Sequence, residues 1–451
     1  MSLNSPLKDQ RLAYLADNNE NVAQFASFEP GSEPTLRYQR IRGLGNHAAR
    51  LEKVAAALLA VSSSCNVRTF RTPPVKSSPF EYGLTRLDDI LGFIRKYAAE
   101  GYYTIINETI DVDDGGVSGV ALGGIVEFAP QATPRAVEEA DAFTAPYELG
   151  FALLDIVYGF RPKIPQHLDR RIEFSIHPRK VGYHRSHTLL WEEESIAPVH
   201  MSAQPIWPNR FSRFLGDKAF GLVVAHILGF PVPRTMVIPR RIAPFVFGQG
   251  TSSNERWMRT CPTEQVPGKF TTTEHWSDPF LVMAEEDPTG QQIASVLSQD
   301  GIEAAYSGAT APRKDGSDEV EGVPGPGLLF MQGRRQKGVL PRQVKDDVHD
   351  LLAKLNKALG ACRIEWVHDG NKPWVVQLHV VRERLTPGVL SPGEADHWLN
   401  YDPAEGLERL RRIVNEARYA HAGVLVANKV GITSHVGDIL RRAQVPARFA
   451  E

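Results

Sequence analysis

Apolar positions along the chain follow two spacings, that of a helix and that of a strand. Leu87–Ala99 has apolar residues at the three-and-four spacing of an amphipathic helix. Residues 65–70, 103–106 and 124–128 are short runs of β-branched and aromatic side chains between turn residues, and they predict strands. Helices and strands of this kind alternate to about residue 385, so the sequence predicts a mixed α/β fold.

Composition predicts loops and a linker between these elements. Residues 248–273 are rich in Gly, Ser, Thr and Pro, and residues 311–327 contain few apolar side chains. Pro387 and Gly388 mark a linker, after which residues 403–420 form a predicted charged helix. We therefore expect three parts: a first lobe over 1–200, a second lobe over 201–385 and a short C-terminal unit over 386–451.

The tripeptide Arg-Ile-Glu, followed by an aromatic residue, occurs twice, with its glutamate at Glu173 and at Glu365. A Ser-Gly dipeptide and a further glutamate, Glu127 or Glu321, precede each copy. The interval from Glu127 to Glu173 nearly equals the interval from Glu321 to Glu365, and each contains a helical stretch. Matched order and spacing favour two related lobes. The alternative is that similar strands recur without duplication in an α/β protein.

The second copy predicts a hairpin. Residues 363–367 form one strand, a turn containing Asp-Gly follows, and residues 374–380 form the return strand. Glu365 and Gln377 lie on these two strands, where alternate side chains share a face. A carboxylate and an amide oxygen there can bind a divalent cation, which prefers oxygen ligands and bridges phosphates. An ordinary buried hairpin is the alternative.

This hairpin resembles the end of the ATP-grasp nucleotide domain in the phosphoenolpyruvate synthase, pyruvate phosphate dikinase and rifampin phosphotransferase family. The family signature is an Ile-Glu-Trp strand, a turn and a strand ending Gln-x-Arg-Pro. Glu365 matches its glutamate, Gln377 matches its glutamine, and His379 stands where the family has arginine. The resemblance implies an ATP-grasp-like fold, as two related lobes or as a circularly permuted domain. It also implies Mg²⁺ with ATP, and Glu365 and Gln377 as metal ligands.

Other segments resemble the same family. Gly216 and Lys218, with the downstream Leu-Gly-Phe-Pro-Val-Pro, resemble its Gly-Gly-Lys loop, where glycine opens a helix and lysine supplies charge to phosphate. Arg68 lies in a Val-Arg-Thr segment like the family's Val-Arg-Ser, whose arginine contacts phosphates. Glu108 and, in the second copy, Gln299 resemble the end of its Val-Gln-Glu strand. The resemblance implies an ATP-binding set of Lys218, Arg68, Glu108, Gln299, Glu321, Glu365 and Gln377. A helix start with a solvated lysine and a strand with a surface arginine are the alternatives.

The segment 431–435, Gly-Ile-Thr-Ser-His, resembles the start of the family's phosphohistidine domain. Neutral imidazole is a nucleophile near pH 7. In the family a histidine takes a phosphoryl group from the nucleotide and passes it to an acceptor. The resemblance therefore implies that His435 is catalytic and that the acceptor is a small molecule, which the sequence does not identify. A Thr-Ser helix cap beside an incidental histidine is the alternative.

Charge and cysteine usage exclude several classes of partner. The formal net charge is −2, which provides no long-range attraction to nucleic acid or to an acidic membrane. No apolar run approaches the ~18 residues of a membrane span, and the first residues lack the apolar core of a signal peptide. The three cysteines form no CxxC pair. We expect no nucleic-acid partner, no membrane association and a cytoplasmic location.

These observations support one leading function and two alternatives. The leading hypothesis is an ATP-dependent phosphotransferase, a kinase of the dikinase type, that acts through His435. The first alternative is an ATP-grasp ligase that activates a carboxylate as an acyl phosphate and does not need His435. The second alternative is a non-catalytic, nucleotide-binding regulatory protein.

Overall fold

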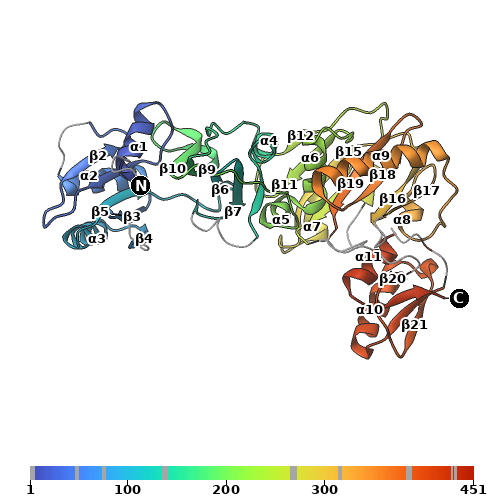
Figure 1. Cartoon of the computed structure of the whole chain (residues 1–451). Helices are drawn as coiled ribbons and strands as arrows, with labels where there is room; N and C mark the ends of the chain where they lie inside the picture. The colour runs from blue at the N-terminus through green and yellow to red at the C-terminus, as the bar shows by residue number, and fades with distance from the viewer. Residues whose placement is uncertain are drawn as a thin grey trace. The chain divides into compact units, whose positions relative to one another are not determined.

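The computed structural model describes residues 6–45, 50–73, 78–134, 141–264, 272–312, 317–381, 389–427, 430 and 434–450. The chain divides into two compact units (Figure 1). Unit 1 comprises Met1–Phe151 and Phe160–Ala203, and unit 2 comprises Ala152–Gly159 and Gln204–Glu451. Among the described residues, no helix is long and apolar enough to cross a membrane.

Unit 1 contains two antiparallel five-stranded sheets. The first has the order β2-β1-β5-β3-β4, from β1 (Phe25–Phe28), β2 (Leu36–Arg40), β3 (Cys65–Phe70), β4 (Phe80–Leu84) and β5 (Tyr103–Glu108). The second has the order β10-β9-β6-β7-β8, from β6 (Val117–Leu122), β7 (Ile125–Pro130), β8 (Phe143–Pro146), β9 (Arg170–Val181) and β10 (Ser186–Ser195). The helices are α1 (Lys8–Asp17), α2 (Leu51–Val61) and α3 (Leu87–Ala99). A further helix, α4 (Tyr147–Tyr158), precedes β9; its residues to Phe151 belong to unit 1, and those from Ala152 belong to unit 2.

The first sheet of unit 1 is covered by α2 and α3. The apolar stripe of α3 places Ile90 and Ile94 in a buried cluster with Val54 of α2 and Val67 of β3. Complete burial of each such side chain contributes about 1.5–3 kcal/mol. The spacing of apolar residues in the sequence therefore predicts both this helix and the face that it buries.

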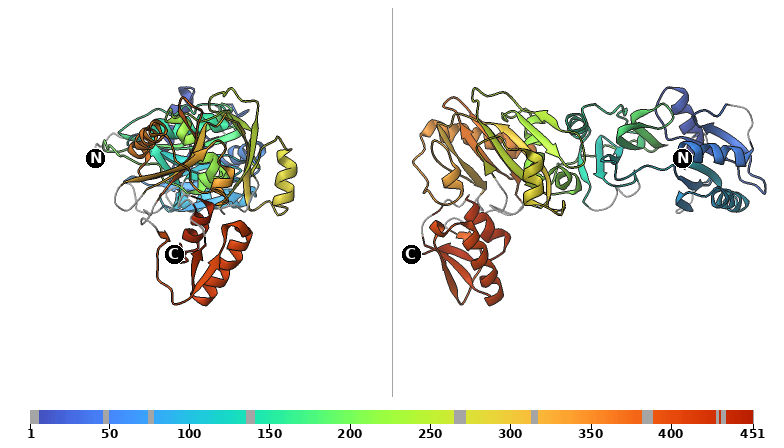
Figure 2. Two further views of the ribbon diagram at one scale, coloured as in Figure 1. Left: turned by 90° about the vertical axis from the view of Figure 1, so that its right-hand side faces the viewer. Right: turned by 180° about the vertical axis from the view of Figure 1, so that it is seen from behind.

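Unit 2 repeats this arrangement. Its first sheet has the order β12-β11-β15-β13-β14, from β11 (Thr235–Pro239), β12 (Phe245–Phe247), β13 (Arg256–Pro262), β14 (Thr272–Thr273) and β15 (Ile293–Asp300). Its second sheet has the order β17-β16-β18-β19, from β16 (Tyr306–Pro312), β17 (Asp318–Pro324), β18 (Cys362–His368) and β19 (Pro373–Val380). The helices are α5 (Arg210–Leu215), α6 (Asp217–Ile227), α7 (Pro279–Glu286), α8 (Leu328–Met331) and α9 (Arg342–Leu359). Figure 2 shows these elements from two further sides.

The two units share one strand order. In each first sheet, two hairpins flank the fifth strand, β5 in unit 1 and β15 in unit 2. In each second sheet, the order β7-β6-β9-β10 of unit 1 corresponds to β17-β16-β18-β19 of unit 2. Each unit thus has a complete set of strands. The described strands therefore form two sets with the same order, as the prediction of two related lobes expects.

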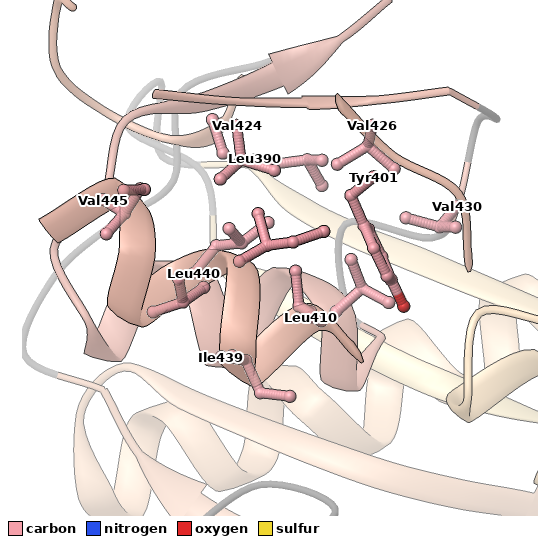
Figure 3. Close-up of a cluster of buried hydrophobic side chains, with 14 of the residues drawn as sticks. Leu390, Tyr401, Leu410, Val424, Val426, Val430, Ile439, Leu440 and Val445 are labelled. Carbon is pink, nitrogen blue, oxygen red and sulfur yellow. The ribbon is translucent and has the colours of Figure 1, made fainter. Parts of the chain in front are cut away.

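The C-terminal part of unit 2 has a core of its own. Its sheet has the order β20-β23-β22-β21, from β20 (Val389–Ser391), β21 (Trp398–Tyr401), β22 (Gly423–Val426) and β23 (Ala447–Phe449), with helices α10 (Leu407–Ala420) and α11 (His435–Arg442). The strands β21, β22 and β23 are parallel. Figure 3 shows the shared interior, where Val424 and Val426 come from the sheet and Leu410 and Leu440 come from the helices.

The structure confirms the mixed α/β class and most of the predicted elements, but both predicted loops are wrong. Strand β13 lies within 248–273, and strand β17 lies within 311–327. In each case residues typical of turns flank a short strand, and pairing with a neighbouring strand, β15 for β13 and β16 for β17, overrides composition. The predicted linker residues Pro387 and Gly388 lie outside the described residues.

Candidate functional site

The second sheet of unit 2 aligns the predicted acidic and amide residues in one row. Ala309 of β16 pairs with Glu321 of β17 on one side and with Glu365 of β18 on the other. Glu365 in turn pairs with Gln377 of β19. Direct cross-strand partners share a face of the sheet. Glu365 and Gln377 are therefore neighbours, whereas Glu321 lies two strands from Glu365, beyond a small alanine.

The Gln377 amide lies between Glu365 and His379. With its amide nitrogen toward Glu365, Gln377 donates to both carboxylate oxygens at 2.9 and 3.1 Å, and its oxygen accepts from His379 Nε2 at 2.8 Å. With the amide reversed, its oxygen occupies the position beside the carboxylate. The two orientations of the Gln377 amide have the same shape. They differ only in whether its nitrogen or its oxygen lies beside the Glu365 carboxylate.

Lys218 is placed by the packing of α6. Gly216, between α5 and α6, has a φ of 88°, which favours glycine, and an added Cβ would lie 2.5 Å from Cys261 Cβ. One turn later, a Cβ on Gly221 would lie 2.2 Å from the Leu378 carbonyl oxygen of β19. Gly221 allows the helix to lie directly against β19, the strand that carries Gln377, and Gly216 allows its start to lie against Cys261 of β13. The predicted glycine-lysine helix start is thus present.

Arg259 is a site residue that the sequence analysis missed. It lies on β13, inside the segment predicted as a loop. Its Nη1 donates to Gln299 Oε1 at 2.6 Å, and Gln299 Nε2 donates to Thr235 Oγ1 at 3.1 Å. Gln299 is buried, and both ends of its amide are used. Gln299 therefore orients the arginine.

One cavity of about 270 Å³ brings these residues together. Its lining includes Lys218, Arg259, Gln299, Glu365, Gln377 and His435. Five of the eight residues predicted as the site, namely Lys218, Gln299, Glu365, Gln377 and His435, therefore meet in unit 2. Gly431, Ile432 and Thr433 of the motif that contains His435 lie outside the described residues.

The cavity has two partly buried cations, Lys218 and Arg259. Its lining also includes four carboxylates, namely Glu365, Glu255, Glu274 and Asp300, of which Asp300 is paired with Arg256. Burial lowers the pKa of Lys218, although the Cys261 thiol and the Glu365 carboxylate act in the opposite direction. Burial likewise lowers the pKa of Arg259, against the attraction of Glu365. Within the described ranges, neither cation forms an ion pair with a carboxylate within 4.0 Å. Burying positive charge without a counter-charge is costly, so the site favours an anionic ligand.

The remaining predicted site residues lie elsewhere. Glu321 is buried and accepts from Lys337 Nζ at 3.0 Å, and it is not part of the cavity lining. Arg68 and Glu108 belong to unit 1. Glu108 accepts from the backbone and side-chain nitrogens of Gln24 at 2.8 and 3.0 Å, and burial raises the pKa of this carboxyl.

The positions of Glu365 and Gln377 suit a magnesium ion whose coordination shell is completed by a bound ligand. Ligands 2.0–2.1 Å from an octahedral Mg²⁺ lie about 3 Å from one another. The Gln377 amide position is 2.9 and 3.1 Å from the two Glu365 oxygens, so its oxygen and the carboxylate can share one ion. The described residues contain no group of three or more His, Cys, Asp or Glu side chains arranged for a metal. Phosphate oxygens and water would supply the other ligands, as is usual for Mg²⁺.

Comparison with known proteins gives structural matches only. No family model and no curated protein matches the sequence. Similar solved structures include a D-alanine–D-alanine ligase from Helicobacter pylori, with TM-score 0.26 and 10% identity over 38% of this chain and 52% of that chain. D-cycloserine synthetase DcsG matches with TM-score 0.24 and 15% identity over 43% and 63%. A RimK-domain ATP-grasp protein from Sphaerobacter thermophilus matches with TM-score 0.23 and 15% identity over 37% and 58%.

These matches correct the expected family. Each match covers less than two thirds of the known protein, with a TM-score below 0.5, and stands as a likeness of part of the fold. The named proteins are a D-alanine–D-alanine ligase, a D-cycloserine synthetase and a RimK-domain ATP-grasp protein, and none is a phosphoenolpyruvate synthase or a dikinase. The predicted resemblance to the phosphoenolpyruvate synthase and pyruvate phosphate dikinase family is therefore wrong. The resemblance was based on short motifs, and the phosphohistidine role implied for His435 loses its support.

Proposed function

We propose that unit 2 binds ATP with Mg²⁺ and that the protein is an ATP-dependent ligase, which joins a carboxylate to an amine. One observation carries the proposal. Lys218 and Arg259 are cations without a carboxylate partner in the described chain, and they line the same cavity as the Glu365–Gln377 pair. The ligases among the similar solved structures agree with this function.

A triphosphate satisfies both halves of the cavity. Lys218 provides a point charge, and the Arg259 guanidinium provides several donors in a plane, which suits phosphate oxygens. Gln299 holds Arg259 through a 2.6 Å hydrogen bond, so little side-chain freedom is lost when the anion binds. If the ligand were a carboxylate, there would be no reason for Glu365 to lie beside the two cations. If the ligand is a triphosphate with Mg²⁺, Glu365 has the role of holding the metal.

The residues of the cavity would act by positioning and by charge. In the first step, a substrate carboxylate oxygen bonds to the γ-phosphorus of ATP while the bond from that phosphorus to the β,γ-bridging oxygen breaks, which gives an acyl phosphate and ADP. Lys218 and Arg259 would stabilise the charge that spreads over the transferred phosphoryl oxygens. Glu365 and Gln377 would hold Mg²⁺, which would supply further positive charge to the phosphates.

In the second step, an amine nitrogen bonds to the acyl carbon, the carbon–oxygen bond to phosphate breaks, and the amine loses a proton. The products are an amide and inorganic phosphate. The acid and the amine are not identified. No histidine is phosphorylated in this sequence of steps, so His435 lines the cavity without carrying a phosphoryl group.

Turnover assays test this function. The full chain is incubated with Mg²⁺, γ-labelled ATP and a pool of carboxylic acids, either with hydroxylamine to trap an acyl phosphate as hydroxamate or with a pool of amines, and ADP, hydroxamate and phosphate are measured. In the wild type we expect hydroxamate that forms only with a carboxylic acid present, and phosphate release that requires an amine. Both should be lost in Lys218→Ala. Acid-labile label on the protein that disappears in His435→Ala would contradict the proposal. ATP binding with no turnover for any pair would instead indicate a non-catalytic nucleotide-binding protein.

A further inference from the structure

The register of the two units pairs their site residues one by one. Glu173 of unit 1 lies between Val120 and Glu192, as Glu365 of unit 2 lies between Ala309 and Gln377. Glu192 therefore occupies the position of Gln377. This correspondence between the units follows from strand register. A register shift of one residue would place every side chain of a strand on the other face of its sheet, so the register determines which residues correspond.

The first sheets extend the correspondence. Arg68 pairs with Ile105 of β5, as Arg259 pairs with Leu297 of β15. Ile105 and Leu297 each lie two residues before an amide, Asn107 or Gln299, and these amides occupy equal positions. Arg68 is thus the unit 1 counterpart of Arg259.

The helix starts correspond as well. Leu190 N donates to Asn21 O at 2.8 Å, and Val375 N donates to Pro231 O at 2.8 Å, at matching positions of β10 and β19. Counting back the same number of residues from Asn21 and Pro231 reaches Lys8 at the start of α1 and Lys218 at the start of α6. Lys8 is therefore the counterpart of Lys218.

Unit 1 also retains a cavity at this place. Its volume is about 260 Å³, close to the 270 Å³ of the unit 2 cavity. The corresponding lining residues include Arg68, Asn107, Glu173 and Trp191 in unit 1. Lys218 and Gln377 line the unit 2 cavity, whereas their counterparts Lys8 and Glu192 do not line the unit 1 cavity. The two pockets therefore differ at the end where these residues lie.

Glu192 forms ion pairs with both cations of unit 1, Lys8 and Arg68. Lys8 Nζ donates to Glu192 Oε1, and Arg68 Nη1 donates to Glu192 Oε2 at 3.3 Å. Arg68 is further fixed by a 2.9 Å hydrogen bond from its Nη2 to Trp191 O. Burial alone would raise the pKa of Glu192, but Arg68 and Lys8 outweigh it and lower this pKa. The carboxylate is therefore an ion near neutral pH and serves as a fixed anion between the two cations.

We propose that unit 1 is a second nucleotide pocket that Glu192 keeps closed to triphosphates by occupying the place of the phosphates. This inference depends on the proposed function of unit 2 only for its choice of ligand. A phosphate entering unit 1 would displace a carboxylate that is already paired with Lys8 and Arg68, and would leave that carboxylate buried without a partner. Gln377 has the same shape as Glu192 without the charge, so in unit 2 the cations stay available.

Exchange of these two residues tests the proposal. The number of ATP molecules bound per full chain is measured by equilibrium dialysis with labelled ATP and Mg²⁺. The variants are Glu192→Gln, Gln377→Glu and, as a control that removes the same charge two residues away, Glu194→Gln. Arg68→Ala is added to Glu192→Gln to locate any new site, and circular dichroism checks that each variant folds.

The proposal predicts one ATP per chain in the wild type and in Glu194→Gln, two in Glu192→Gln, and one again when Arg68→Ala is added. Gln377→Glu is expected to lose the unit 2 site. A folded Glu192→Gln that binds no additional ATP, or a wild type that binds two, would overturn it. If Glu192→Gln does not fold, unchanged ATP affinity in Gln377→Glu overturns it. A wild type that binds no ATP refutes the proposed function of unit 2 instead. In that case, one ATP bound by Glu192→Gln would still support the proposal that Glu192 closes the unit 1 pocket.

Discussion

Glu192 and Gln377 occupy the same register position in two copies of one fold, opposite Glu173 and Glu365. Around them the copies keep a lysine at a helix start and an arginine on the third strand of the first sheet. One carboxylate in place of one amide therefore changes the balance of charge in the pocket. In unit 1 the cations are paired within the protein, and in unit 2 they are available to a ligand.

Arg259 is expected to contribute strongly to ATP binding. Loss of charge-assisted hydrogen bonds to phosphate in Arg259→Ala should cost about 2–3 kcal/mol, or roughly 30- to 150-fold in Kd. Arg68→Ala removes the matching arginine of unit 1. It should change the Kd for ATP by less than about twofold, because Arg68 is already paired with Glu192. Isothermal titration calorimetry with ATP and Mg²⁺ measures both. Equal losses in the two variants would contradict the assignment to unit 2.

Glu365 is expected to set the dependence on Mg²⁺. In Glu365→Gln, the Mg²⁺ concentration for half-maximal ATP binding should rise by at least about tenfold, since loss of even an outer partner of a metal costs about 10- to 100-fold. Glu321→Gln is the matched control, because Glu321 lies in the same row but outside the cavity lining. Its Mg²⁺ dependence should stay at the wild-type value. A larger shift in Glu321→Gln than in Glu365→Gln would place the metal elsewhere.

The sequence predicted the hairpin of Glu365 and Gln377 and the duplication, because hydrophobic spacing and the repeated Arg-Ile-Glu are local signals. It missed Arg259 because turn-forming residues on both sides hid a strand in which Trp257, Met258 and Cys261 already supply strand-forming side chains. It missed Lys8, whose role emerges only when strand register aligns the two units. It also grouped Arg68 with Lys218, because a motif search does not distinguish two copies of a site.

Gly221 is expected to hold α6 against β19. A methyl group in Gly221→Ala would lie 2.2 Å from the Leu378 carbonyl oxygen, so the helix must move, at a cost of about 1–3 kcal/mol. The shift should also weaken ATP binding, because Lys218 lies on the same helix. Gly92→Ala is the control, since Gly92 lies within α3 with no atom within 4 Å of the added Cβ. It should be stabilising by up to about 1 kcal/mol. Urea unfolding measures both, and similar stabilities would refute the close-packing argument.

Asp287 is expected to make unit 2 sensitive to acid. Burial would raise its pKa, but hydrogen bonds from the backbone of Ile293 and Gln292 and from the Thr289 hydroxyl lower it from 3.8 to about 2. Because the folded pKa lies below the unfolded one, the stabilisation is complete above about pH 4 and is lost as the pH falls toward 2.

In Asp287→Asn, stability at pH 7 should fall by about 1–3 kcal/mol, and the part of the acid dependence between pH 4 and 2 that Asp287 causes should disappear. Urea unfolding across this pH range measures it. Asp350→Asn, at an exposed position of α9, should behave like the wild type. An unchanged acid dependence in Asp287→Asn would show that other carboxyls determine it.

Photolabelling with 8-azido-ATP and Mg²⁺, followed by peptide mapping, tests the central claim most directly. We expect label that excess ATP suppresses, confined to peptides that line the unit 2 cavity, such as those containing Trp257, Met331 or Val376. The label should be lost in Lys218→Ala and retained in Lys8→Ala. Label that ATP suppresses in unit 1 of the wild type, or no such label anywhere in the chain, would contradict the assignment of the nucleotide site to unit 2.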